Sequence, residues 1–271
     1  MDAREKRVTE LIKSEVQLKV PVYQRTYDWE KKHCKKLLED IVTVIKNTNL
    51  QSHFIGAIVY IEKGLHHLGS VNEFLIIDGQ QRITTLMLIL AAIEELAIKS
   101  DKIQFAEQVR KQCLINEYVK SEEHNLINKL ILTKPDNEIF HKIINHETVE
   151  DKSNITINYN YIRNYLEESV IKEKISLEQI YQTINSKIIV VAIALDRNRD
   201  NAQLIFESIN STGMDLSSGD LIRNFLLMNL EDKTQNEIYS KYWYPMQESL
   251  KKNLTGFFLD YIYMKRGTTT N

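Results

Sequence analysis

The segment from Phe74 to Ile98 constrains the fold of this chain more than any other. Phe74–Ile77 is apolar and rich in β-branched residues, which indicates a buried strand. A turn without apolar side chains follows at Asp78–Arg82, and an almost wholly apolar stretch then extends to about Ile98. Since a helix that is apolar all round has to be surrounded by protein, this stretch predicts the central buried helix.

Three other segments predict the remaining strands. Val16–Val20 alternates apolar and polar residues, and Phe54–Ile61 is β-branched and aromatic, so we expect the latter to pair antiparallel with Phe74–Ile77. The apolar run Ile188–Leu195 predicts a buried strand that returns to the same sheet. By contrast, Ser100–Ser186 shows helical patterns and no strong strand signal.

These patterns predict an α+β fold with a small mixed sheet. The chain has only 8 Gly and 3 Pro in 271 residues, which favours long helices over a many-stranded sandwich. We expect residues 1–98 and 187–230 to form the α+β core, 99–186 a helical insertion, and 231–271 the start of a C-terminal helical region.

Composition excludes several classes of protein. A net charge of −2 argues against a uniformly basic nucleic-acid wrapper, although Lys and Arg outnumber Asp and Glu within Met1–Lys36. Cys34 and Cys113 have no CxxC or Cys/His spacing, which argues against a disulfide framework or a zinc module. No signal peptide or stretch of about 20 apolar residues is apparent, so we expect a cytoplasmic protein without a membrane partner.

The Asp78–Arg82 turn is the strongest candidate for chemistry. Gly79 permits a tight turn, and the N–H groups of Gln80 to Thr84 would lie at the positive end of the long helix. Gln80, Gln81 and Arg82 add donors suited to phosphate, and Asp78 could hold Mg²⁺ or orient a water. The alternative interpretation is that Asp78 caps the helix and Arg82 is a surface charge.

A second candidate motif lies between Tyr23 and Trp29. Gln24 and Arg25 have no evident structural purpose there, which favours ligand binding. The aromatic residues fit the core better than base stacking. We expect Asp28 to cap the helix that follows.

A third candidate lies between Phe206 and Asp220. Asn210 and Gly213 could serve only a helix–loop–helix corner, but Asn210 and Thr212 are surplus polar groups that could face a ligand. No Walker A loop, HExxH motif or nucleophile–His arrangement is present, and Asp78 and Glu207 are the main candidate bases. Binding is therefore better supported than turnover.

All three motifs resemble the DUF262 domain, the N-terminal domain of GmrSD-type modification-dependent restriction systems, also found in RloF-like proteins. The resemblance covers about Leu11 to Leu230 and rests on three runs, of which the second is the most specific. These are Pro21-x-Tyr23-Gln24-Arg25-x-Tyr27-x-Trp29, Ile77-Asp78-Gly79-Gln80-Gln81-Arg82-x-Thr84-Thr85-Leu86, and Phe206-Glu207-x-Ile209-Asn210-x-x-Gly213 with Asp220-Leu221-Ile222.

The resemblance implies a ParB/sulfiredoxin-like core, nucleotide binding and hydrolysis at the Asp78–Arg82 block, and a role in phage defence. Family members commonly continue into an HNH nuclease module, and no His-Asn-His constellation occurs here. We therefore expect the module to be C-terminal or a separate partner, and self-association is compatible with the pattern.

Two functional hypotheses follow. In the first, an NTP is held by Gln24, Arg25, Gly79–Arg82, Thr84, Asn210, Thr212 and Gly213, with Asp78 and Arg82 as catalytic residues and Mg²⁺ at Asp78. In the second, the same pocket binds modified or single-stranded DNA without hydrolysis, and aromatic residues stack on bases.

Overall fold

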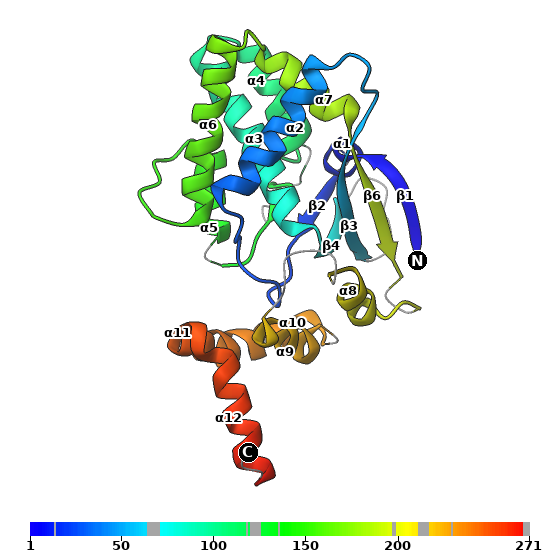
Figure 1. Cartoon of the computed structure of the whole chain (residues 1–271), viewed down its shortest axis with the longest axis vertical. Helices are drawn as coiled ribbons and strands as arrows, with labels where there is room; N and C mark the ends of the chain where they lie inside the picture. Colours follow the sequence, from blue (N-terminus) through cyan, green and yellow to red (C-terminus); the bar gives the residue numbers. More distant parts are fainter. Residues whose placement is uncertain are drawn as a thin grey trace. The chain divides into compact units, whose positions relative to one another are not determined.

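The computed structural model divides the chain into two compact units (Figure 1). It describes residues 1–13, 15–63, 71–117, 119, 126–134, 136–196, 199–210, 217–228 and 230–267. Unit 1 comprises Met1–Pro21 and Thr26–Asp200, and unit 2 comprises Val22–Arg25 and Asn201–Asn271. The domain boundaries expected at residues 98, 186 and 230 stay a prediction.

Unit 1 contains one six-stranded mixed sheet with strand order β1-β6-β3-β4-β2-β5. Pairs β1–β6 and β3–β4 are antiparallel, whereas β6–β3, β4–β2 and β2–β5 are parallel. The strands are β1 (Asp2–Arg7), β2 (Val16–Lys19), β3 (His53–Lys63), β4 (Asn72–Asp78), β5 (Leu130–Ile131) and β6 (Ile188–Leu195). This mixed sheet confirms the α+β prediction.

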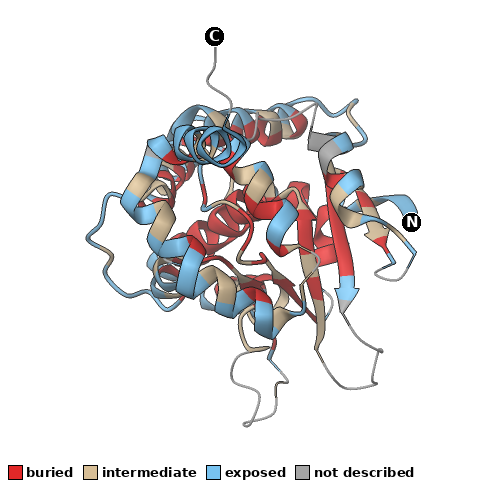
Figure 2. Ribbon diagram, turned by 90° about the horizontal axis from the view of Figure 1, so that it is seen from below, coloured by how far each residue is buried: buried red, intermediate tan, exposed pale blue. Residues whose placement is uncertain are grey.

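Helices cover the sheet and surround α3, the longest of them (Figure 1). They are α1 (Val8–Ile12), α2 (Lys31–Lys46), α3 (Gln80–Lys99), α4 (Ile103–Val109), the π-helical turn η1 (Arg110–Leu114), α5 (Asp136–Ile144), α6 (Asn154–Lys172) and α7 (Leu177–Lys187). Residues 86–93 of α3 are all at most 1% exposed, and Figure 2 shows buried residues concentrated where helices and sheet meet. The prediction of a central buried helix is confirmed.

Two strands were not expected. β1 is a charged segment at one edge of the sheet, antiparallel to β6, and it is almost entirely exposed. Charged side chains are typical of edge strands, where they discourage pairing with other chains, and they hide the usual strand pattern. β5 has only two residues, so its pairing with β2 depends on tertiary context.

The start of α2 corrects the prediction that Asp28 is its cap. Glu30 is the N-cap residue, and it forms a reciprocal capping box with His33. The backbone N–H of Asp28 instead donates to the side chain of Gln81, which extends the loop by two residues. The side chains of Ser153 and Ser176 cap α6 and α7.

The described residues of unit 2 form helices joined by short connections, together with the segment Val22–Arg25. Its elements are α8 (Ala202–Asn210), α9 (Ser218–Leu227), α10 (Asp232–Ile238), η3 (Tyr239–Trp243), α11 (Tyr244–Leu250), η4 (Lys251–Asn253) and α12 (Leu254–Arg266). Ser217 and Asp220 form a capping box at the start of α9. Among the described helices of both units, none is long and apolar enough to cross a membrane.

Candidate functional site

Gly79 makes the turn between β4 and α3. Its φ of +90° lies in the left-handed region, and a Cβ at this position would meet the carbonyl oxygen of Ala57 at 2.9 Å. Gly79 is also the N-cap of α3, where it offers no side-chain cap. Glycine is therefore required at position 79, as the sequence suggested, because of the backbone conformation and the close approach of β3.

Arg82 lies on the first turn of α3 against the backbone of β3. Its Nη1 donates to the carbonyl oxygen of Ala57 at 2.7 Å, the one hydrogen bond that Arg82 makes with the described residues. A Cβ on Gly56 would lie only 2.6 Å from Nη2, so the guanidinium packs directly over this glycine. Burial lowers the pKa of Arg82, and the nearby Asp78 carboxylate opposes that shift.

Gln81 has a structural role at the start of α3. Its side-chain oxygen accepts hydrogen bonds from the backbone N–H groups of Asp28 and Trp29 at 2.8 and 3.1 Å. Its side-chain amide donates to the carbonyl oxygen of Thr26 at 3.1 Å. One buried amide thus fixes the loop that precedes α2, and ligand binding by Gln81 stays a prediction.

Two threonines of this helix are buried and bond back to its first turn. The hydroxyl of Thr84 donates to the carbonyl oxygen of Gln80, and that of Thr85 to the carbonyl oxygen of Gln81. Thr85 also contacts the hydroxyl of Tyr27 at 2.8 Å. These bonds fix the Gln80–Thr85 segment, and the ligand role predicted for Thr84 stays a prediction.

Tyr27 belongs to the core. Its ring is 6% exposed, and its hydroxyl also accepts a hydrogen bond from the side chain of Asn158 at 3.2 Å. The backbone N–H of Tyr27 donates to the carboxylate of Asp136 at 2.5 Å. Trp29 is half-buried and stacks on His33. Burial of Tyr27 favours the core interpretation of this aromatic residue over base stacking.

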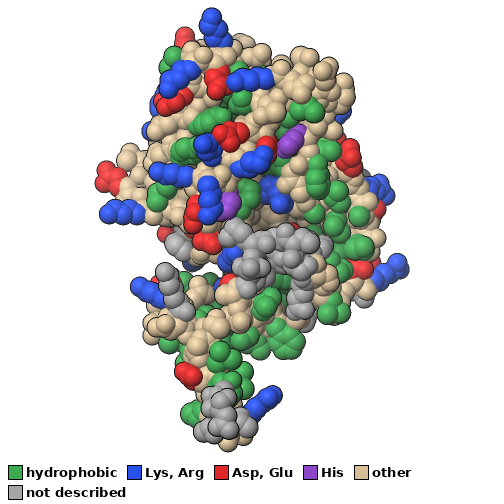
Figure 3. Space-filling view, viewed as in Figure 1, with side chains coloured by type: hydrophobic (Ala, Val, Ile, Leu, Met, Phe, Trp, Pro, Cys, Tyr) green, Lys and Arg blue, Asp and Glu red, His purple; other side chains and the backbone are tan. Residues whose placement is uncertain are grey.

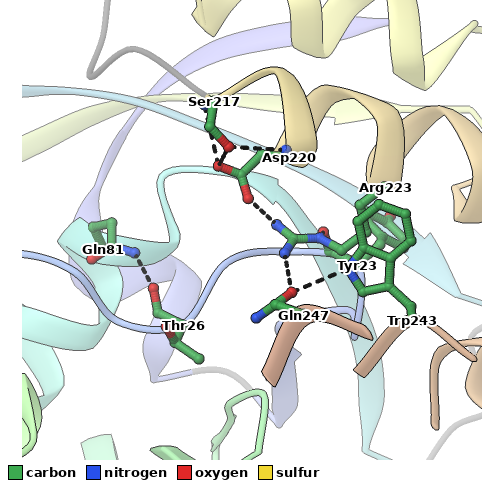
Figure 4. Close-up of polar contacts among 8 residues, drawn as sticks. All are labelled: Tyr23, Thr26, Gln81, Ser217, Asp220, Arg223, Trp243 and Gln247. Carbon is green, nitrogen blue, oxygen red and sulfur yellow. Dashed lines mark hydrogen bonds and ion pairs between the residues drawn. The ribbon is translucent and has the colours of Figure 1, made fainter. Parts of the chain in front are cut away.

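The loop residues before Thr26 are held within unit 2. Figure 4 shows Arg223 of α9 at the centre of this cluster, where Nε donates to the carbonyl oxygen of Tyr23 at 2.5 Å. Arg223 also pairs with Asp220 at 2.7 Å and donates to Gln247, which accepts from Trp243 as well. Burial lowers the pKa of Arg223, and Asp220 opposes the shift. Arg223 thereby fixes the segment that carries Gln24 and Arg25.

The predicted site residues fall into three groups. Asp78, Gly79, Gln80, Gln81, Arg82 and Thr84 come together in unit 1. Gln24, Arg25 and Asn210 belong to unit 2. Thr212 and Gly213, and the side chain of Asn210, lie outside the described residues.

Asp78 is the single carboxylate in the predicted block. No group of three His, Cys, Asp or Glu side chains that could hold a metal occurs in the described part of the chain. Mg²⁺ bound with a nucleotide commonly takes only one or two protein carboxylates, because phosphate oxygens and waters complete its shell. The residues present therefore fit a nucleotide-borne Mg²⁺ with Asp78 as protein ligand, but they do not fit a metal site made by protein alone.

Sequence reasoning missed Gly56, Asp136, Asn158 and Arg223, which position the candidate residues. Each of these residues contacts a partner at least 25 positions away in the sequence. No local spacing rule could have identified such pairs. The glycine within the apolar run Phe54–Ile61 was the only available signal, since an isolated strand glycine often marks close backbone approach.

The face of unit 1 that Figure 3 presents carries charges of both signs among its described residues. Figure 3 shows Lys and Arg side chains interspersed with Asp and Glu over its visible helices. On α2, Lys36 pairs with Asp40 at 2.5 Å and Lys35 with Glu39 at 3.7 Å. The excess of basic residues at the front of the sequence is thus partly compensated on this helix.

A protein-family model matches most of the chain. Residues 8–227 match the family described as GmrSD restriction endonuclease, N-terminal domain. No curated protein matches the chain. The matched range contains all three candidate motifs and continues from unit 1 into α9 of unit 2.

Proposed function

The chain belongs to the family of GmrSD restriction endonuclease N-terminal domains, and from that premise we propose that it is the nucleotide-binding regulatory domain of a restriction system. Its ligand is an NTP whose phosphates lie at the start of α3. The domain acts on DNA in the cytoplasm together with an HNH nuclease module, and its core is of the ParB/sulfiredoxin-like type.

The main support for this proposal is the hydrogen bonding of Arg82. Its guanidinium is partly buried, and among the described residues it has a single hydrogen-bond acceptor, the carbonyl oxygen of Ala57. A partly buried guanidinium with N–H donors that no described protein group uses is suited to an oxyanion such as phosphate. The neighbouring N-terminus of a 20-residue helix adds a favourable field for that anion.

The remaining residues have distinct proposed roles. Gln80 and the backbone after Gly79 complete the phosphate cradle, and Asp78 holds the nucleotide's Mg²⁺ or orients a water. Gln24, Arg25, Asn210, Thr212 and Gly213 keep the nucleotide-binding role predicted for them. Bound nucleotide biases the domain between conformations that restrain or release the nuclease. Hydrolysis is the less supported part, since Asp78 is the one base in the block.

Calorimetric titration with ATP and GTP, each with and without Mg²⁺, tests the proposal. We expect Arg82→Gln to abolish nucleotide binding, and Arg82→Lys to weaken it, because Lys keeps the charge but loses the fork. Arg4→Gln, at an exposed side chain of the edge strand β1, is the matched control and should bind like the wild type. Nucleotide binding by Arg82→Gln at wild-type affinity would refute the site.

The alternative function, DNA binding by base stacking, has less support than nucleotide binding. The ring of Tyr27 is buried and its hydroxyl is engaged by Thr85 and Asn158, so it is not available to a base. If the domain is instead a DNA-binding module without hydrolysis, DNA affinity will fall steeply with salt and no phosphate will be released from NTP.

A further inference from the structure

Unit 1 has a cavity of about 630 Å³ at the end of α3 opposite to Arg82. It lies between the last turns of α3 and the middle of α6, and residues 147–149 of the α5–α6 connection close one side. Cavities of this size commonly bind small molecules. None of the candidate nucleotide-binding residues lines it, so it is independent of the proposed function.

Arg163 of α6 is the most informative residue of the cavity wall. It makes no hydrogen bond with any residue in the described ranges, and its Nε is buried. Its one ion pair is with Glu95, at 3.6 Å from Nη1 to the carboxylate, which is longer than a good hydrogen bond. A guanidinium that faces a cavity with unused donors is suited to a ligand carboxylate or phosphate.

Glu95 does not depend on Arg163 for its neutralisation. It accepts a hydrogen bond from the hydroxyl of Tyr159 at 2.5 Å, and the ammonium of Lys99 lies 2.5 Å from its other oxygen. Burial alone would raise the pKa of Glu95, but the hydrogen bonds from Lys99 and Tyr159 outweigh it and lower the pKa. Arg163 can therefore turn to an incoming anion without leaving Glu95 unpaired.

The other charged groups of the cavity wall, His146 and Glu147, have an ion-pair partner or are exposed to solvent. His146 pairs with the buried carboxylate of Glu94 at 3.1 Å, behind the cavity. Its positive φ of 58° follows from the end of α5, where the N–H groups of His146 and Glu147 bond to Ile143 and Lys142 in a Schellman motif. Glu147 is exposed at the rim, where solvent screens its charge.

Apolar side chains form the rest of the wall. Ile98, Ile143 and Val149 line the cavity, and the ring of Tyr159 adds a further apolar surface. Asn160, one helical position from Tyr159 and three from Arg163, contributes an amide that has no hydrogen bond with the described residues. The wall thus offers cationic and amide donors beside an apolar surface.

We propose that this cavity is a binding site for a small organic anion, a carboxylate or phosphate group on an apolar ring, with Arg163 as the anion-binding residue. The oxyanion pairs with the fork of Arg163 and with Asn160, while the ring packs on Ile98, Ile143 and Val149. Lys99 and Tyr159 keep Glu95 occupied and so leave Arg163 to the ligand.

Benzoate and phenyl phosphate are suitable probes, because each joins an oxyanion to an apolar ring. Binding to the full chain would be followed by two-dimensional ¹H–¹⁵N NMR titration, with amides of α3 and α6 as reporters. We expect Arg163→Gln to weaken binding roughly 10- to 100-fold, the loss typical of a charged hydrogen bond. Whichever probe binds more tightly identifies the preferred oxyanion.

Two further variants keep the test decisive. Ile98→Glu, at a side chain that is 40% exposed, adds a carboxylate to the apolar wall and should weaken binding without unfolding the protein. Arg199→Gln, at an exposed side chain that does not line the cavity, should bind the probes like the wild type. The proposal is overturned if neither probe shifts the α3 and α6 amides, or if both bind equally to the wild type and Arg163→Gln.

Discussion

Gln81 and Arg223 hold adjoining stretches of a single loop. Gln81 donates to the carbonyl oxygen of Thr26, as Figure 4 shows, and it accepts from the backbone N–H groups of Asp28 and Trp29. Arg223 donates to the carbonyl oxygen of Tyr23. The two residues lie 142 positions apart in sequence and in different units. Gln24 and Arg25 lie between the two anchored stretches in the sequence.

The Gln81 anchor predicts a clear loss of stability on truncation. Gln81→Ala removes three hydrogen bonds and leaves the N–H groups of Asp28 and Trp29 without this acceptor. We expect the free energy of unfolding to fall by roughly 2–4 kcal/mol, measured by urea denaturation. Gln182→Ala, at an exposed position of α7, should change it by less than about 0.5 kcal/mol. Equal effects of the two variants would contradict the structural role of Gln81.

The Arg223 anchor predicts a loss confined to unit 2. Arg223→Lys retains the charge, but a lysine cannot reach Tyr23, Asp220 and Gln247 together. We therefore expect the free energy of unfolding of unit 2 to fall by about 3 kcal/mol. Fluorescence of Trp243 in a Trp29→Phe background would report on this cluster, because Trp243 shares the Gln247 acceptor.

Arg266→Lys is the control for that measurement. Arg266 is exposed at the end of α12, and the substitution should leave the Trp243 transition in place. An Arg223→Lys transition that coincides with the wild type would show that the hydrogen bonds around Arg223 do not stabilise unit 2.

Local pattern predicted those parts of the fold that local interactions determine. The apolar runs gave β4, α3 and β6, and the Gly79 turn followed from its glycine between two apolar elements. β1 was missed because it is a charged edge strand that tertiary pairing holds against β6. In the candidate site, the Asp78–Arg82 turn was predictable, whereas the Arg223–Tyr23 bond joins residues 200 positions apart and leaves no local signal.

The packing of Arg82 on Gly56 predicts that this glycine is needed for nucleotide binding. Gly56→Ala would place a Cβ 2.6 Å from Nη2 of Arg82, at a φ of +114° that alanine rarely adopts. We expect a loss of about 1–3 kcal/mol in stability. Affinity for nucleotide should also fall, because Arg82 is displaced although it is chemically intact.

Gly256→Ala provides the matched control. A Cβ on Gly256 of α12 would meet nothing within 4 Å, so alanine should stabilise the helix by up to about 1 kcal/mol and leave nucleotide binding unchanged. If Gly56→Ala, folded at the assay temperature, bound nucleotide with wild-type affinity, the position of Arg82 would be irrelevant to binding.

Asp136 predicts a pH dependence of stability. It is buried beneath the Tyr27 loop, and burial raises its pKa from 3.8 to about 6, against the effect of the hydrogen bond from Tyr27. The folded state therefore binds this proton more tightly than the unfolded state. Its contribution is fully present below about pH 4 and is lost as pH rises through about 6.

Asp136→Asn removes this titration while its side-chain oxygen can still accept the Tyr27 hydrogen bond. Relative to the wild type, the variant should gain up to roughly 3 kcal/mol in unfolding free energy as pH rises from about 4 to about 7. Urea denaturation across this range measures the difference, and Asp260→Asn on the exposed face of α12 is the control. A constant difference between Asp136→Asn and the wild type at every pH would show that Asp136 titrates as it does in the unfolded chain.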